Sequence, residues 1–291
     1  MPISRKIMGV SKGGVSKKAI FGYGSSGGGV SMTNLVSNIG VVSGDVTGVG
    51  SARYQLGAAS YGSDKAIFGY GEINGPKTAI TNKVSNTGVV ATDTTGVGTA
   101  RAWLAGTGYG TDKAIFGYGD DGDKVSMTNK ISNTGVASTD TTGVGTARRE
   151  LAAAGYGTDK AIFGYGYTNS SQSMTNLVNN TGVVATDITG VGTARSQLAG
   201  AGYGTDKAIF GYGSSNFTNL VSNTGVVASN VTGVGTSRNA LAAAGYGTDK
   251  AIFGYGSSNF TNLVSNTGVV ASDVASVGTG RPYLAASSYG S

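Results

Sequence analysis

The sequence predicts an all-β protein built from repeats of a single unit. The seven residues KAIFGYG occur six times without a change, and successive copies start 47, 48, 47, 47 and 43 residues apart. Glycine supplies 52 of the 291 residues, and no window shows the 3.6-residue apolar period of a helix. A repeat of this length, with four short segments separated by turn signals, is typical of a six-bladed β-propeller with four-stranded blades. The copies begin at Lys18, Lys65, Lys113, Lys160, Lys207 and Lys250.

Each unit contains four expected strands, which the unit after Arg195 illustrates. The first strand, 198–204, is small and apolar, as suits an innermost position. The second, 207–213, is KAIFGYG, whose large apolar residues fill volume between neighbouring blades while its glycines allow close approach. The third, 218–223, alternates in character, and the fourth, 226–230, follows an NTG turn. Because equivalent blades meet equivalent neighbours, one sequence can serve six times.

The ring of blades is expected to close through the C-terminal strand. Residues 281–291 keep the residues expected of a first strand, whereas the N-terminal RKIMGVSKGG keeps only Arg5. We therefore expect 281–291 to pair with the first KAIFGYG, which would leave no long free edge. Two parts follow: a basic N-terminal segment, 1–12, and a single propeller domain, 13–291. The residues kept at the C-terminus are Arg281, Leu284, Ala285, Ala286 and Tyr289.

Composition excludes several classes of site. The chain has no cysteine and no histidine, so it lacks disulfides, thiolate metal ligands and the commonest general base. No metal and no cofactor are predicted. The formal charge is +6, with five cations and no acid between Arg5 and Lys18, which we interpret as a solvated basic end or a contact with an acidic partner. No nucleic-acid partner, membrane insertion or secretory signal is predicted.

The carboxylates argue against an enzyme. Ten of the 15 recur with the repeat, either eight residues before an arginine or in the turn before KAIFGYG. A catalytic pair needs two different environments, and symmetric copies supply only one. A hydrolase or lyase is therefore the third hypothesis. The segment GDDGDKVS from Gly119 resembles part of a calcium loop but lacks its terminal glutamate, and we interpret it as a solvated acidic loop. The acids outside the repeat are Glu72, Asp120, Asp121, Asp123 and Glu150.

Six arginines each open a first strand and are expected to ring one mouth of the central channel. Guanidinium groups bind carboxylate and phosphate, so the ring could bind an anion or a glycan. We favour a structural role, in which each arginine pairs with the aspartate eight residues upstream. The six are Arg53, Arg101, Arg148, Arg195, Arg238 and Arg281.

Two sets of positions vary between the units: the loop between the second and third strands, and the pair after each arginine. In an up-and-down blade both sets lie on one face, while the turns of the opposite face hardly change. A rigid scaffold with one diversified face indicates a binder, with neutral drift of surface loops as the alternative. Trp103, the only tryptophan, is either a stacking surface for a ligand or a packing residue. The predicted ligand-binding residues are Trp103, Tyr54, Tyr283, Arg149, Glu72 and Tyr167.

The unit resembles the kelch repeat, with Arg101 and LAGTGYG in place of its first part and KAIFGYG in place of its IYVFGG-like strand. It departs from kelch in lacking the outer-strand tryptophan. The wording GVGTARxxLAAAGYGTDKAIFGYG also resembles repeat-rich structural proteins of tailed phages, of the tail or fibre type.

These resemblances imply a non-enzymatic, virion-associated or surface recognition module that engages a glycan or a protein through its variable face. The implied partners are other virion or surface proteins or a host glycan, with a homo-oligomer as a further option. The expected location is the virion, or otherwise the cytoplasm. The alternative is an intracellular protein-interaction scaffold of kelch type.

Overall fold

The computed structural model describes residues 16–290, which form small antiparallel sheets and contain no helix. The basic segment predicted at 1–12 lies outside the described residues. The first three sheets are β19 (Ala285–Tyr289), β1 (Lys18–Gly22) and β2 (Thr33–Val36); β3 (Gly57–Tyr61), β4 (Lys65–Gly69) and β5 (Thr81–Val84); and β6 (Ala105–Tyr109), β7 (Lys113–Asp120) and β8 (Lys124–Ile131). The others are β9 (Ala152–Tyr156), β10 (Lys160–Gly164) and β11 (Thr175–Val178); β12 (Ala199–Tyr203), β13 (Lys207–Gly211) and β14 (Thr218–Val221); and β15 (Ala242–Tyr246), β16 (Lys250–Gly254), β17 (Phe260–Val264) and β18 (Val274–Ala275).

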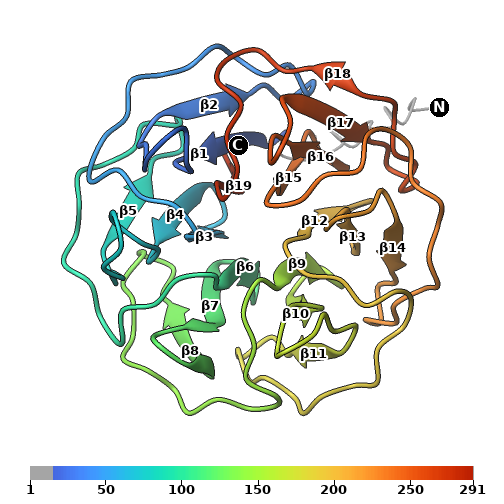
Figure 1. Cartoon of the computed structure of the whole chain (residues 1–291), viewed down its shortest axis with the longest axis horizontal. Coiled ribbons are helices and arrows are strands. Elements are labelled where there is room, and N and C mark those ends of the chain that lie inside the picture. The colour runs from blue at the N-terminus through green and yellow to red at the C-terminus, as the bar shows by residue number, and fades with distance from the viewer. Residues whose placement is uncertain (1–15, 291) are drawn as a thin grey trace, which may run out of the picture.

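The sheets share one orientation relative to the centre of the molecule. Strands β3, β6, β9, β12, β15 and β19 lie nearest the centre in Figure 1, and β2, β5, β8, β11, β14 and β17 lie toward the outside. Each of these inner strands contacts the inner strands of two other sheets; β19, for example, contacts β15 and β3. Repeated small sheets in this order are consistent with a β-propeller-like fold.

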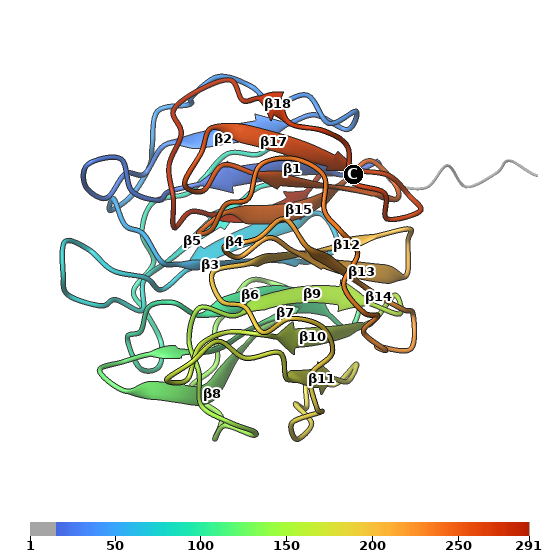
Figure 2. The same ribbon diagram turned by 45° about the vertical axis from the view of Figure 1, so that its right-hand side comes forward.

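The C-terminal strand joins a sheet whose other strands come from the start of the chain. β19 pairs antiparallel with β1, in a register that runs from Lys18 opposite Tyr289 to Gly22 opposite Ala285. The same register joins β3 to β4, where Lys65 lies opposite Tyr61. Strand β19 is the partner that the sequence predicts for the first KAIFGYG. Figure 2 shows this sheet next to the sheet of β15–β18.

The KAIFGYG strands interlock through a phenylalanine and a glycine. A Cβ on Gly22 would lie 2.6 Å from the ring of Phe68 in the next sheet, so the ring occupies the space that a side chain would need. The last sheet repeats this relationship toward the first, because a Cβ on Gly254 would lie 2.6 Å from Phe21. The alanine, isoleucine and phenylalanine of these strands are fully buried. The repeated heptapeptide is therefore the packing surface between sheets.

The expected fourth strand is regular only in the last sheet, as β18. Elsewhere the fourth segment is attached by isolated bridges, such as Thr33–Val46 and Val36–Val42 in the first sheet. In every sheet a buried asparagine of the third strand also holds the fourth segment. Asn34 donates its side-chain amide to the carbonyl of Ser43 at 3.2 Å, and Asn262 donates to Ala271 at 2.9 Å in the sheet that contains β18.

Candidate functional site at the variable face

Strand register brings the two variable sets of residues to the same end of the sheets. Gly69, at the end of β4, lies opposite Gly57, at the start of β3, so the loop that follows β4 runs beside the residues that precede β3. Isolated bridges join the two segments, as between Tyr54 and Glu72. The position expected for the variable face agrees with this geometry.

A small pocket of about 80 Å³ opens at this end, in front of the inner strands. We call it the mouth pocket. Its floor consists of leucines that lie three residues after each arginine, all nearly buried. Its rim consists of the residues that directly precede these leucines. The rim residue differs from repeat to repeat, except that glutamine occurs in two repeats. The floor is Leu56, Leu104, Leu151, Leu198, Leu241 and Leu284, and the rim is Gln55, Trp103, Glu150, Gln197, Ala240 and Tyr283.

The rim residues are linked in a cycle by backbone hydrogen bonds. Trp103 donates its N–H to the carbonyl of Gln55 at 2.8 Å, and Glu150 donates to Trp103 at 2.9 Å. The same bond recurs from Gln197 to Glu150, Ala240 to Gln197, Tyr283 to Ala240 and Gln55 to Tyr283. Every rim residue also has a positive φ, between 53° and 60°. A non-glycine residue holds this conformation only where its surroundings fix it, so the rim is a rigid platform.

Trp103 and Tyr283 meet across this platform. Their ring centres lie 5.0 Å apart and the rings are inclined by 80°, an edge-to-face arrangement. Both side chains are half-buried. The pair therefore keeps aromatic surface available to a ligand while each ring supports the other.

The other predicted ligand-binding residues also form pairs. The Tyr54 hydroxyl donates to the Glu72 carboxylate at 2.6 Å, and this hydrogen bond raises the pKa of Tyr54. The Arg149 guanidinium lies 5.7 Å from the ring centre of Tyr167. These two pairs lie between the rim and the long loops, outside the mouth pocket. The six predicted residues thus form three contacts on one face.

The long loops of three successive repeats are tied together by charged groups. Lys77 and Arg149 both form ion pairs with Asp120, the latter at 2.8 Å, and Lys124 donates to the side chain of Asn169 at 3.2 Å. Burial alone would raise the pKa of Asp120, but hydrogen bonds from Lys77 and Arg149 and the charge of Lys77 outweigh it and lower the pKa. The loops are therefore held in place before any ligand binds.

The interpretation of GDDGDKVS as a solvated acidic loop is wrong for its first aspartate. The segment is the tip of the hairpin formed by β7 and β8, where Asp120 pairs with Lys124 in the register. The side chain of Asp120 is only 10% exposed because it serves the ion pairs described above. Within residues 16–290, no group of three or more acidic or other ligand-type side chains is placed to hold a metal ion.

The six arginines do not line the mouth pocket. They are buried between sheets, where each guanidinium lies over the tyrosine of the preceding KAIFGYG copy, as Arg53 does over Tyr23 at 4.3 Å. Arg53 donates to the carbonyl of Tyr70 and to the side chain of Asn82. The predicted partner eight residues upstream is wrong: Arg53 faces Asp93, 40 residues downstream, at 3.8 Å. The fourth segment of a repeat packs on the arginine of that repeat's own sheet, which spacing along the chain does not reveal.

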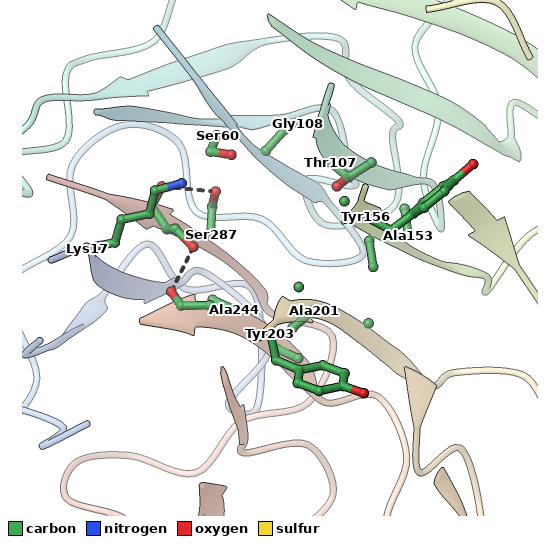
Figure 3. A pocket seen from close by; sticks show the side chains of 18 of the residues that line it. Lys17, Ser60, Thr107, Gly108, Ala153, Tyr156, Ala201, Tyr203, Ala244 and Ser287 are labelled. Atoms are coloured by element: carbon green, nitrogen blue, oxygen red, sulfur yellow. Dashed lines mark hydrogen bonds between the residues drawn. The ribbon is translucent and has the colours of Figure 1, made fainter. Parts of the chain in front are cut away.

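The opposite ends of the inner strands enclose a channel of about 240 Å³. In Figure 3, Lys17 extends toward Ser287 in this channel, and Ser60 and Thr107 lie on its wall. The turns around it interlock. Gly62 donates its N–H to the carbonyl of Asp112 in the next sheet at 2.7 Å, and similar bonds join the other turns. This packing gives a structural reason for the constancy of the turns on this face.

Rim residues other than Trp103 and Tyr283 were not singled out from the sequence. The pair after each arginine varies at both positions, but only its second member enters the mouth pocket, while the first turns toward the loops. A positive φ at the second position produces this division. The identity of residues such as Glu150 or Gln197 does not predict that backbone conformation.

No protein-family model matches the chain. A search of curated proteins gives no match either. Among residues 16–290 there is no helix with the length and apolar character needed to cross a bilayer.

Proposed function

We propose that the six sheets are the blades of a six-bladed, kelch-like β-propeller that the C-terminal strand closes. Three observations support this proposal: the neighbour contacts of the inner strands, the pairing of β19 with β1, and the cycle of backbone hydrogen bonds around the rim. In this proposal the bridged outer segments are irregular fourth strands, and only the last sheet has a regular one.

We further propose that this propeller is a binding protein rather than an enzyme, and that it recognises a glycan or protein ligand at the variable face. The observation that carries the proposal is the half-buried Trp103–Tyr283 pair on the rigid rim. Aromatic rings that are fixed before binding lose little entropy when a ligand stacks on them. The interlinked loops beside the pair extend the surface that is available for contact. A virion location and virion partners stay predictions from the sequence resemblance.

A screen against a glycan array, followed by titration of Trp103 fluorescence, tests the function. One class of glycan should shift the emission saturably, and Trp103→Ala should abolish its binding without lowering the melting temperature. Ser214→Ala is a matched control, since it lies in one of the short loops on the same face.

Two results would count against the proposal. Blue-shifted Trp103 fluorescence that acrylamide does not quench would mark Trp103 as a packing residue. Retention of ligand affinity in a stable Trp103→Ala variant would place recognition elsewhere. A protein ligand captured at the same face, with the same dependence on Trp103, would support the kelch-type alternative within the proposal.

A further inference from the structure

The edge-to-face pair at the rim creates a corner with aromatic surface on two sides. Because the Trp103 and Tyr283 rings are inclined by 80°, a small group placed in the corner contacts both. The floor beneath is apolar, since it consists of leucine side chains. Aromatic faces carry negative charge density and attract cations, tryptophan most strongly. The corner therefore favours a compact cationic group with an apolar surface.

Two side chains that line the pocket offer hydrogen-bond acceptors with unused capacity. The side-chain oxygen of Gln55 is buried and has no hydrogen-bond partner within residues 16–290. The Glu150 carboxylate receives contacts from Gln197 at 3.2 Å and Arg149 at 3.3 Å, which leaves part of its acceptor capacity unused. An unpaired buried acceptor is costly, so a ligand that brings a positive charge or a donor is favoured.

The charged side chains beside the mouth pocket also favour a cationic ligand. No lysine or arginine lines the mouth pocket. Apart from the buried arginines and the acids they face, the loops beside it hold five carboxylates and three cations. The carboxylates are Glu72, Asp120, Asp121, Asp123 and Glu150, and the cations are Lys77, Lys124 and Arg149. The chain as a whole carries +6, so the negative balance at this face is local.

From these observations we infer that the mouth pocket binds an ammonium group, either a trimethylammonium or a protonated amine carried by the ligand. The volume of about 80 Å³ suits such a group better than a whole sugar ring. This inference rests on the proposed function, because it names the chemical group that the same face recognises in its ligand. The aromatic corner supplies cation–π attraction, and Glu150 supplies the counter-charge.

Choline and its neutral isostere 3,3-dimethyl-1-butanol provide a direct test, since they share a shape and differ in charge. Choline should change Trp103 fluorescence saturably, and the isostere should bind roughly tenfold more weakly or not at all. Glu150→Gln, which removes the charge and keeps the shape, should weaken choline binding several-fold. Asp123→Asn removes a carboxylate from the same face outside the pocket and should leave the affinity unchanged.

Equal binding of the two probes would overturn the inference, as would an unchanged choline affinity in a folded Glu150→Gln variant, or no saturable response to choline. A glycan or protein ligand that depends on Trp103 but is not displaced by choline would overturn the ammonium site and leave the proposed function standing. Loss of both the Trp103-dependent ligand and the choline response would remove both proposals.

Discussion

The guanidinium carbon of Arg148 lies 4.4 Å from the ring centre of Tyr118, which belongs to the preceding KAIFGYG copy. The same guanidinium donates to the carbonyl of Tyr165 at 2.8 Å and to the side chain of Asn176 at 2.7 Å, both in its own sheet. One buried side chain thus connects two sheets. Six such arginines explain why an arginine recurs at this place in every unit, as TAR or SAR in four of them, TSR at Arg238 and TGR at Arg281.

Arg148→Ala should lower the free energy of unfolding by roughly 3 kcal/mol, because it removes the cation–π contact and leaves buried acceptors unpaired. Chemical denaturation measures the change. Lys160→Ala, which removes an exposed ion pair with Asp159, should change stability by about 0.5 kcal/mol or less. A loss no larger than that of the control would show that Arg148 does not hold the sheets together.

Asp140 should contribute to the loss of folded-state stability at low pH. Burial alone would raise its pKa, but hydrogen bonds from Thr99 and Asn129 and the charge of Arg101 outweigh it and lower the pKa below the ordinary 3.8. The stability that this carboxylate provides is therefore present above about pH 3.8 and is lost as the pH falls toward the folded-state pKa.

The chain supplies a matched exchange, since Asn230 occupies the equivalent place and accepts the N–H of Thr193 at 3.1 Å. Asp140→Asn should flatten the fall of melting temperature below pH 4, and Asn230→Asp should steepen it. Thermal unfolding between pH 7 and pH 2.5 measures both slopes. Unchanged slopes in both variants would contradict the assignment.

Alkaline unfolding should begin near the ordinary tyrosine pKa. Burial raises the pKa of Tyr118 to about 12, against the opposing charge of Arg148. Because the folded-state pKa is raised, stability is intact below pH 10 and is lost as the pH rises from about 10 toward 12. The same applies to Tyr23, Tyr212 and Tyr255.

Tyr118→Phe should reduce this alkaline loss while sacrificing the hydrogen bond to Val144, at a cost of about 1 kcal/mol at neutral pH. Tyrosinate absorbance and circular dichroism, followed together, measure the effect. The half-exposed Tyr167 provides the control, because Tyr167→Phe should leave the alkaline transition in place. Ionisation of the buried tyrosines well before unfolding would contradict the prediction.

Deletion of residues 282–291 should prevent stable folding. It removes β19, which pairs with β1 and contacts β3 and β15, and so exposes the edge of β1. Deletion of 1–12 should leave the thermal transition nearly unchanged. Melting curves and solubility compare the two truncations, and a folded C-terminal truncation beside an unfolded N-terminal one would refute the predicted pairing.

The amino-acid sequence alone determined the first three strands of each repeat and their order. KAIFGYG marks the second strand of each sheet, and its glycine–phenylalanine pair recurs because the same inter-sheet contact recurs. The better match of 281–291 to a first strand predicted the partner of β1. Local patterns suffice here because each repeat meets the same neighbours, so identical environments leave identical residues.

Tertiary structure decided the contacts between repeats. Arg53 faces Asp93 rather than Asp45 because the fourth segment of its own repeat lies over it, and sequence distance does not encode this proximity. The positive φ at the rim turns Trp103 toward Tyr283, 180 residues away, and Glu150 lines the same pocket. The proposed binding surface takes single residues from several repeats, so it forms only when the sheets are assembled and the side chains are oriented toward one another.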